Sequence, residues 1–402
     1  MAVSVRKAVF LLQTDPYLPK PVLRALREAE ALKRAGWDVA FVSWIKGTLP
    51  SNAPSEAYPT RRVNVPVPPL GTSFVRRALA YNRAMKRMFR ACVDEKPDLI
   101  IAHDFEVLRA GAMAKRWTRK PLFYDSHEDW PALIAENSAH EARIAKAEER
   151  RLCRRVAHVI TVSEPIADKF RRMKKDTTVL YNARPESEIH LADREASRRS
   201  FGYGVDDFVV GFAGALASGR GLEILLGALP MLPPSTKALI VGGPDEEARR
   251  LRTLAQAEGL QDRVRVDGYR AFRELATYYA SMDVGVILLD RRPNHERALP
   301  NKLFDYMAHG VAVIVPDYPA MAPIVRDGPC GWTISEVRPE LVKAAILEAC
   351  SSGEAGARGA RGRERYLRSF AWDKQAAKFL SIVLGLGGPS VREREKVRTF
   401  EP

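Results

Sequence analysis

The sequence has 402 residues, which is long enough for two domains with separate hydrophobic cores, and 46% of its residues are apolar, as in ordinary globular proteins. The sequence contains no run of roughly 18 apolar residues, so no membrane-spanning helix is predicted. The N-terminus lacks a signal-peptide pattern. The four cysteines are widely separated and form no CxxC pair, which excludes a zinc site or disulfide framework. We therefore expect a cytoplasmic protein. The net charge of +15 indicates either an anionic partner or an arginine-rich surface that serves solubility.

Short apolar runs alternate with helical runs along nearly the whole chain. The clearest helices of the first half are Pro21–Ala35 and Phe74–Val93. The strands predicted in the first half are Ala8–Leu12, Val39–Ser43, Val63–Val67, Leu99–Ala102, Leu122–Tyr124, Val159–Val162 and Val179–Tyr181. The strands predicted in the second half are Phe208–Ala213, Ala238–Val241, Val264–Val266, Val284–Leu288 and Val311–Val315. This alternation is typical of parallel sheets with helices on both faces.

The connecting segments indicate the domain organisation. Arg184–Ser200 is polar, contains a proline and has no clear strand, so we place a linker there. We predict an α/β protein with two tandem doubly wound (Rossmann-like) domains, at residues 1–188 and 200–370. Ser351–Arg363 is rich in Gly, Ala and Arg and predicts an exposed turn, and the charged residues 388–402 predict a mobile tail.

Acidic and histidine side chains follow two predicted strands of the first half. His103 and Asp104 follow the fourth strand, and Asp125 and His127 follow the fifth. Because a doubly wound sheet binds its ligand at the carboxyl ends of its strands, we expect these side chains near the ligand. An imidazole there can hydrogen-bond a hydroxyl or phosphate oxygen, although either cluster could also be a polar rim of the sheet. We expect no metal, since no second histidine lies at ligand spacing.

A glycine-rich turn follows the first strand of the second half. Gly214 ends the strand, and Gly219 and Gly221 flank Arg220 just before a predicted helix. Glycines let the backbone approach a ligand closely, and an arginine between them can chelate a diphosphate. Ordinary strand-to-helix turns are also glycine-rich, so this turn alone does not establish a phosphate site. Gly243, after the next strand, lies in a turn positioned to border a nucleotide.

The segment Glu296–Gly310 predicts a helix that a proline begins and a glycine ends. No Ser or Asp caps it, so the amides near Asn301 and Leu303 are open to an anion such as phosphate. Lys302 adds a positive charge, and Asp305 adds a carboxylate that suits ribose hydroxyls. By itself Asp305 could also be an exposed helix acid paired with Lys302. Together these features predict a nucleotide site.

This segment resembles the donor-site motif of glycosyltransferase family 4, the retaining enzymes with the two-domain GT-B fold. Gly-Arg-Gly-Leu-Glu at residues 219–223 resembles the phosphate loop of that family, and Tyr-Asp-Ser-His-Glu at residues 124–128 resembles a strand end whose histidine faces the cleft. Phe370–Trp372 resembles the start of the family's closing helix. The resemblance covers roughly residues 6 to 385. It implies that the two domains face a cleft and that helix 371–387 packs back on the first domain.

The resemblance also implies a role for each group of residues. The donor diphosphate would be bound by Gly214, Gly219, Arg220, Asn301, Lys302 and Leu303. Asp305 would hold the ribose, and Gly243, Tyr269 and Arg270 would lie on the side of the base, although Tyr269 could instead pack at a domain surface. His127 would orient donor and acceptor, ahead of His103 as the histidine of the cleft. His103, Asp104 and Asp125 would lie on the acceptor side. No cofactor and no obligatory metal are implied.

The sequence departs from the family pattern at two places. Many members carry two glutamates separated by seven residues; Asp305 stands at the second position, but Arg297 stands at the first. Glu296, one residue away, is the nearest carboxylate, and we assign it as the catalytic carboxylate that contacts the sugar. The family often has an arginine directly after the strand glycine, where this chain has Ala215, and Lys302 can supply that charge.

Positive charge is concentrated in the first half, because residues 1–190 contain 34 Lys and Arg against 22 Asp and Glu, a net charge of +12. The helix Phe74–Val93 carries six basic residues alongside apolar ones. This pattern fits a helix on an anionic bilayer surface, or the ordinary outer helix of a doubly wound sheet. Peripheral contact with the inner face of the membrane would suit an enzyme whose acceptor is lipid-linked.

We interpret the sequence as a metal-independent glycosyltransferase that moves a sugar from a nucleotide-diphosphate sugar to a hydroxyl of a glycan or lipid-linked acceptor, in polysaccharide or glycoconjugate biosynthesis. Two alternatives stay open: a nucleotide-sugar epimerase or hydrolase of the same fold, and a catalytically silent partner that binds nucleotide or glycan, which Arg297 favours. Nucleic-acid binding is prompted only by the pI of about 9.7 and has no recognition motif, so we do not expect it.

Overall fold

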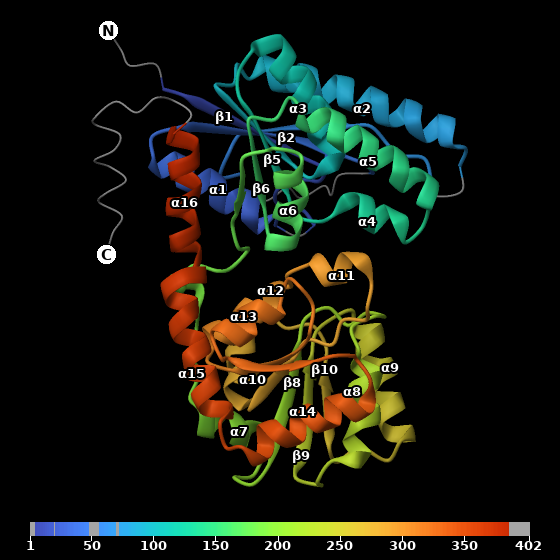
Figure 1. Cartoon of the computed structure of the whole chain (residues 1–402), viewed down its shortest axis with the longest axis vertical. Helices are drawn as coiled ribbons and strands as arrows, with labels where there is room; N and C mark the ends of the chain where they lie inside the picture. The colour runs from blue at the N-terminus through green and yellow to red at the C-terminus, as the bar shows by residue number, and fades with distance from the viewer. Residues whose placement is uncertain (1–4, 20, 48–55, 70–71, 386–402) are drawn as a thin grey trace. The chain divides into compact units, whose positions relative to one another are not determined.

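The computed structural model describes residues 5–19, 21–47, 56–69 and 72–385 (Figure 1), so the predicted tail at 388–402 lies outside the described residues. The chain divides into two compact units, Met1–Tyr181 with Gln375–Pro402, and Asn182–Lys374. Among the described helices, none has the length and apolar composition that crossing a bilayer requires.

The first unit is built on a seven-stranded parallel sheet with strand order β3-β2-β1-β4-β5-β6-β7. Its strands are β1 (Lys7–Leu12), β2 (Asp38–Ile45), β3 (Thr60–Asn64), β4 (Leu99–His103), β5 (Leu122–Ser126), β6 (His158–Thr161) and β7 (Thr177–Val179). Its helices are α1 (Leu23–Arg34), α2 (Phe74–Asp94), α3 (Phe105–Thr118), α4 (Trp130–Ala135), α5 (Ala139–Cys153), α6 (Glu164–Arg172) and most of α16 (Trp372–Gly385).

Helices cover both faces of this sheet. On one face, α2, α3, α5 and α6 pack against the strands, and α2, α3 and α5 lie close to one another (Figure 1). The buried side of α2 includes Met85 and Met88, both fully enclosed. On the other face, α1 and α16 pack together, with Phe379 and Leu380 of α16 in one core with Phe10 of β1.

The second unit repeats this plan with a six-stranded parallel sheet in the order β10-β9-β8-β11-β12-β13. Its strands are β8 (Phe208–Ala213), β9 (Thr236–Val241), β10 (Val264–Asp267), β11 (Val284–Val286), β12 (Ala312–Pro316) and β13 (Gly331–Ile334). Its helices are α7 (Arg194–Phe201), α8 (Leu222–Ala228), α9 (Asp245–Ala257), α10 (Leu275–Ser281), α11 (Pro293–Arg297), α12 (Asn301–Ala308), α13 (Ala322–Asp327), α14 (Pro339–Ser351) and α15 (Ala355–Arg365).

The predicted α/β class with two doubly wound sheets is confirmed, while some element bounds differ. β3 and β7 begin three and two residues before the predicted runs Val63–Val67 and Val179–Tyr181. The sequence analysis missed β13, whose four residues contain a glycine and a threonine and form no apolar run. The polar segment Arg184–Ser200, predicted as a linker, contains the start of α7.

The prediction of an exposed turn at Ser351–Arg363 is wrong, because most of that segment forms α15. Glycine usually disfavours a helix interior, but here it permits close packing. A Cβ on Gly359 would lie 2.0 Å from the carbonyl oxygen of Gly310, and one on Gly362 would lie 3.1 Å from Cβ of Cys330. The glycines therefore let the backbone of α15 approach its neighbours, which composition alone does not show.

Both sheets place a topological switch point beside their first strand. The strand order reverses between β1 and β4 in the first unit and between β8 and β11 in the second. Ligands of doubly wound sheets bind beyond the carboxyl ends of the strands at this reversal. The segments that follow β1, β4 and β5, and those that follow β8 and β11, are therefore where each unit should bind its ligand.

Candidate functional site

In the second unit, Lys302 lies directly over the end of β8. A Cβ on Gly214, the residue after β8, would lie 3.1 Å from the Lys302 amine, and Gly214 has a φ of +141°. The amine is 3.3 Å from the centroid of the Phe212 ring, a cation–π contact. Burial and the positive charge of Arg220 lower the pKa of Lys302 well below its usual value, against the opposing effect of Asp305.

The predicted phosphate loop, Gly219–Gly221, packs against the segment that follows β11. Gly219 and Gly221 have φ angles of +79° and +70°, in the region that favours glycine. A Cβ on Gly221 would lie 2.3 Å from the carbonyl oxygen of Leu288, and one on Gly219 would lie 2.9 Å from Oδ1 of Asp290. Since side chains are excluded at both flanking positions, the loop needs glycine there and holds Arg220 between them.

Arg220 and Lys302 form a pair of neighbouring cations. Within the described residues, neither side chain has a recorded carboxylate partner at ion-pair distance, although Lys302 also feels the charge of Asp305. The charge of Arg220 disfavours the charged form of Lys302. An anion bound beside both would relieve that repulsion and return the pKa of Lys302 toward its usual value. The switch point of this sheet therefore has the electrostatics of an anion site.

The start of α12 supplies fewer free amides than predicted. Pro300 is the residue before the helix, which starts at Asn301, and no side chain caps it. The amide of Leu303 donates to the Pro300 carbonyl at 3.0 Å, so its assignment as a donor to an anion is not supported. For the amides of Asn301 and Lys302, no hydrogen bond is recorded within the described part of the chain. These two remain the candidates for anion contact.

Asp305 is half-buried and paired with a residue that the sequence analysis placed in the linker. Arg184 Nε is 3.2 Å from Oδ1 of Asp305, and the Arg184 guanidinium lies 3.3 Å from the centroid of the Phe272 ring. The alternative of an exposed acid paired with Lys302 is therefore not what the structure shows. No sequence pattern identifies Arg184, because its partner is 121 residues away.

The three residues assigned to the base side lie together after β9 and β10. A Cβ on Gly243 would lie 3.5 Å from Cβ of Tyr269, and the Gly243 carbonyl accepts a hydrogen bond from the Leu216 amide. Arg270 donates to the carbonyl of Tyr269. The Tyr269 side chain is 68% exposed, so within this unit it presents a free aromatic face, which suits stacking on a base.

Glu296 lies in the short helix α11, and its carboxylate is 3.5 Å from Nη1 of Arg291. A different carboxylate, Asp290, lies beside the glycine loop, and its backbone amide donates to the Gly219 carbonyl. Arg292 and His295 hold it at 2.6 and 2.7 Å. Sequence analysis missed Asp290 because it follows the predicted strand Val284–Leu288 in a polar run with no motif.

The first unit gathers the predicted acidic and histidine residues around a buried arginine from α1. Arg24 Nε is 2.7 Å from Oδ2 of Asp125, and Nη2 is 3.1 Å from Oδ1. Arg24 also donates to Glu28 on its own helix and to the Leu180 carbonyl. Arg24 and Glu28 were not predicted as site residues, since helix periodicity gives no reason for a charged pair inside the core.

The two histidines meet beside this arginine. Nε2 of His127 is 3.0 Å from Oδ2 of Asp125 and 3.3 Å from Nδ1 of His103. Nε2 of His103 is 3.3 Å from Glu28. The side chains of His103 and Asp125 are at most 2% exposed, whereas that of His127 is 22% exposed. His127 is therefore the group that can contact a ligand. His103 and Asp125 were predicted to lie on the acceptor side; both are buried, and they position His127 from the protein interior.

Asp104 holds His127 from the other side. One carboxylate oxygen accepts hydrogen bonds from the His127 amide at 3.0 Å and from Trp130 Nε1 at 2.9 Å, and the other accepts from Gln13 Nε2 at 3.1 Å. Asp104 has φ +68° and ψ 162°, a conformation almost confined to glycine that costs roughly 1–3 kcal/mol. Such strain is typical of functional sites, and here it is maintained by three side-chain hydrogen bonds.

The carboxylates set the charge of His127. Burial lowers its pKa, but Asp104 and Asp125 outweigh burial and raise the pKa to about 9, so the imidazole is protonated at neutral pH. Burial raises the pKa of Asp125, but Arg24 and His127 reverse that effect and hold it well below its usual value. Burial and Asp125 raise the pKa of Glu28. The cluster therefore presents one imidazolium at its surface.

His103, Asp125 and His127 also each offer an atom within 4.8 Å of the others, the spacing of a metal site. The stated reason for expecting no metal, the absence of a second histidine at ligand spacing, is thus wrong, because neighbouring strands bring the two histidines together. The Asp125 carboxylate already accepts from Arg24 and contacts a protonated His127. These two positive charges oppose the entry of a metal cation.

Comparison with known proteins matches both units. Residues 21–183 match the family described as glycosyl transferase 4-like domain, and residues 207–352 match glycosyl transferases group 1. D-inositol 3-phosphate glycosyltransferase from Xylanimonas cellulosilytica is 29% identical over 193 residues. That match covers 47% of this chain and 45% of the relative, so the chain aligns with less than half of that relative's length.

Solved structures share the fold over nearly the whole chain. Sucrose-phosphate synthase from Thermosynechococcus elongatus has a TM-score of 0.78 at 18% identity, covering 96% of this chain and 100% of the other. The Anabaena protein HepE in complex with UDP-glucose has a TM-score of 0.69 at 19% identity, covering 94% and 99%. At these identities the likeness establishes the GT-B-like fold. With both halves matched, the chain belongs to the glycosyltransferase 4-like family.

Proposed function

We propose that this glycosyltransferase uses a nucleotide-diphosphate sugar whose diphosphate binds beside Arg220 and Lys302 at the end of β8. The observation that carries this proposal is the pair of neighbouring cations at the switch point of the second sheet. A diphosphate has the charge to neutralise both. The backbone amides of Asn301 and Lys302, at the N-terminus of α12, contribute the positive end of the helix dipole to the same site.

The other residues of the second unit suit the rest of a nucleotide. We assign Asp305 to the ribose, where Arg184 holds its carboxylate in place. We assign Gly243, Tyr269 and Arg270 to the base, since they lie together after β9 and β10 and Tyr269 presents an exposed ring. UDP-glucose, found in the Anabaena structure, is the first donor to test.

In the first unit we assign His127 to the reacting groups of donor and acceptor. A protonated imidazole can donate to a sugar hydroxyl or to a phosphate oxygen as negative charge develops on the leaving diphosphate. We propose that the sugar is transferred to a hydroxyl of a glycan or lipid-linked acceptor with retention of configuration, in polysaccharide or glycoconjugate biosynthesis. We assign the contact with the donor sugar to Glu296, because it is the carboxylate nearest to the sequence position where the family usually has this glutamate. We also propose that no metal is required, because protein cations serve both sites.

We place the enzyme in the cytoplasm with peripheral contact at the inner face of the membrane. Met85 and Met88 of α2 are fully buried in the protein core, so these side chains are not available to a bilayer. The contact we propose is therefore electrostatic. Its carriers are Arg76, Arg83 and Arg90, which are exposed on α2.

Replacing either cation of the donor site should weaken nucleotide binding. We expect Arg220→Ala and Lys302→Ala each to raise the Kd for UDP by roughly 10- to 100-fold, the loss of one charge-assisted contact. Isothermal titration in a metal chelator measures this and tests metal independence in the same experiment. Arg249→Ala, at an exposed position on α9, is the control. Unchanged UDP affinity and unchanged transfer kinetics in both variants would refute the assignment.

The affinity for UDP should fall as the pH rises. The pKa of Lys302 is lowered in the free protein and returns toward its usual value of 10.5 beside a bound diphosphate. Binding therefore takes up a proton in the pH range between these two values, and the Kd should rise by up to about tenfold per pH unit. Lys302→Arg stays charged throughout and should remove this slope while retaining binding. An equal slope in both proteins would exclude Lys302 as its source.

His127 should matter for transfer and not for nucleotide binding. We expect His127→Gln to reduce the rate of UDP release in the presence of a productive acceptor by roughly 10²–10⁴-fold, with UDP affinity unchanged. In the wild type, the rate should fall as the pH rises through about 9, where the imidazolium loses its proton. His140→Gln, an exposed histidine on α5, is the matched control. Equal losses in both variants would count against the assignment.

The basic face of α2 should bind anionic membranes in a salt-dependent way. We expect the protein to float with vesicles that contain phosphatidylglycerol at low salt, and to be released at about 0.5 M salt, where screening shortens to a few ångströms. A variant with Arg76, Arg83 and Arg90 changed to Glu should not float, and neutral vesicles are the control. Absence of the wild-type protein from anionic vesicles at low salt would end this proposal.

A further inference from the structure

The first unit contains an apolar cavity that the functional assignments above do not use. It has a volume of about 720 Å³, within the range of roughly 300–1,000 Å³ that is usual for small-molecule sites. Residues of β2, α2, α3, α4 and α5 line it. Most of them are apolar or aromatic, among them Trp44, Tyr81, Phe105, Ile134 and Ile144.

Core packing does not account for this lining. Ile144 is 44% exposed, and Ala78, Tyr81 and Ile134 are each only partly buried. The walls between α2 and α5 therefore leave apolar surface in contact with water, which is unfavourable unless another apolar group covers it. Further along the same face of α2, Met85 and Met88 are completely enclosed, which shows the contrast with the cavity wall.

One end of the cavity lies beside the His127 cluster. Lys46 and Glu106, which line the cavity, are ion-paired at 2.8 Å. Lys46 also reaches Oε1 of Gln13 at 3.4 Å, and Gln13 donates to the Asp104 carboxylate that holds the His127 amide. A short chain of hydrogen bonds thus connects the cavity with the group assigned to the reacting hydroxyl.

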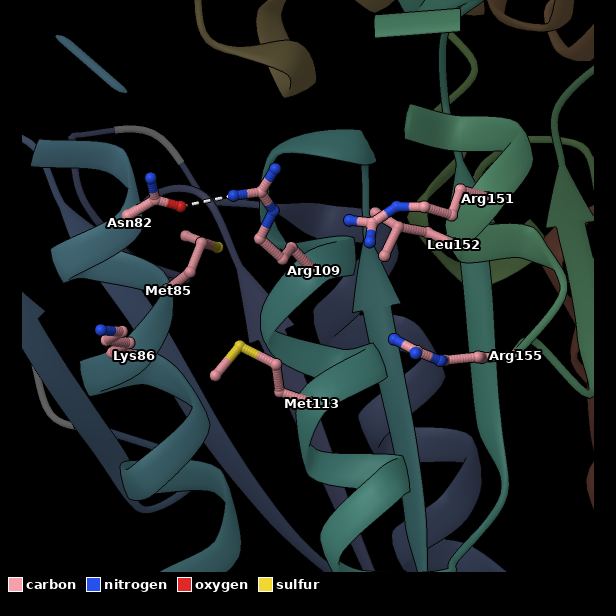
Figure 2. A pocket seen from close by; sticks show the side chains of 8 residues that line it. All are labelled: Asn82, Met85, Lys86, Arg109, Met113, Arg151, Leu152 and Arg155. Atoms are coloured by element: carbon pink, nitrogen blue, oxygen red, sulfur yellow. Dashed lines mark hydrogen bonds between the residues drawn. The ribbon is translucent and has the colours of Figure 1, made fainter. Parts of the chain in front are cut away.

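The other end of the cavity is basic. An adjoining pocket of about 300 Å³ shares Asn82, Arg109 and Arg151 with it. Figure 2 shows Lys86 of α2, Arg109 of α3, Arg151 of α5 and Arg155 just after α5, which line this pocket together with Met85 and Met113. Arg109 and Arg151 share the carboxylate of Glu148. For Lys86 and Arg155, no carboxylate partner is recorded within the described residues, so this end carries excess positive charge.

We propose that the cavity binds the hydrocarbon chain of an anionic lipid acceptor. The anionic headgroup lies at the basic end, and the chain runs along the groove between α2, α3 and α5, so that a hydroxyl at the far end of the chain reaches the His127 cluster. This inference rests on the proposed function for the meaning of "acceptor", but the binding itself does not require catalysis. An extended peptide fits less well, since the aromatic and aliphatic walls formed by Trp44, Phe105 and Ile144 offer no partners for a peptide backbone.

The test measures binding of n-alkyl phosphates of six to twelve carbons, each below its micellar concentration, by isothermal titration. We expect the affinity to rise by up to about fourfold per added methylene, with a negative heat-capacity change, as apolar surface is buried. Ala78→Trp fills the cavity and should abolish the dependence on chain length. Leu79→Trp is the control, because it introduces the same side chain at the next position, which is 64% exposed and lies outside the cavity. This variant should retain the dependence on chain length.

Ile144→Glu provides a second variant, since a partly exposed position tolerates a charge without unfolding the protein. It should weaken long chains most, while Lys86→Ala with Arg155→Ala should weaken alkyl phosphates more than neutral alkyl glucosides. UDP binding, measured in parallel, separates the two proposals. Normal UDP binding with no chain-length dependence, or with equal dependence in Ala78→Trp and Leu79→Trp, overturns the lipid site alone. If the wild-type protein does not bind UDP, the proposed donor site is overturned, and the chain-length result is then interpreted independently of it.

Discussion

The buried guanidinium of Arg24 connects the elements from which the first unit builds its site. It links α1 to Asp125 at the end of β5 and to the carbonyl of Leu180 just after β7. A charge this deep is stable only while it is paired, and removing one partner of such a pair typically costs about 3–5 kcal/mol. Asp125 in turn fixes His127, and with Asp104 keeps it protonated. The interaction that holds these elements together therefore also sets the charge of the group presented to a ligand.

The second unit handles charge in the opposite way. Where Arg24 has two carboxylates, Lys302 feels the repelling charge of Arg220, and the charge of Asp305 opposes this effect. Glycine is required in the loop that carries Arg220, because a side chain at Gly221 would collide with the backbone of Leu288. A cluster whose positive charges are paired with carboxylates is suited to positioning a proton, and a cluster whose positive charges are not paired is suited to binding an anion. This difference supports acceptor chemistry in one unit and donor binding in the other.

The sequence predicted those features that depend on local pattern. Apolar periodicity identified most strands, and the segments after them contained Arg220, Asp125 and His127, because parallel strands bring their carboxyl ends to one edge. The pattern of an uncapped helix start identified Lys302. Sequence analysis failed where tertiary packing decides. Arg24 is more than 100 residues away from Asp125, and Arg184 is more than 100 residues away from Asp305. The glycine-rich α15 resembled a turn because its glycines serve close packing, and spacing along the chain could not show that His103 and His127 meet.

The position of the lipid cavity has a consequence for the shape of the acceptor. One end of the groove lies at the hydrogen bonds that lead to Asp104, and the other lies at the basic residues of α2 and α5. A single lipid can therefore fill the groove and also present the reacting hydroxyl only if its hydrocarbon chain extends across this layer of helices. The basic end then lies on the same helix as the exposed arginines of α2. A membrane held by those arginines would thus present anionic lipid headgroups to the basic end of the groove, and membrane contact and acceptor choice would both depend on α2.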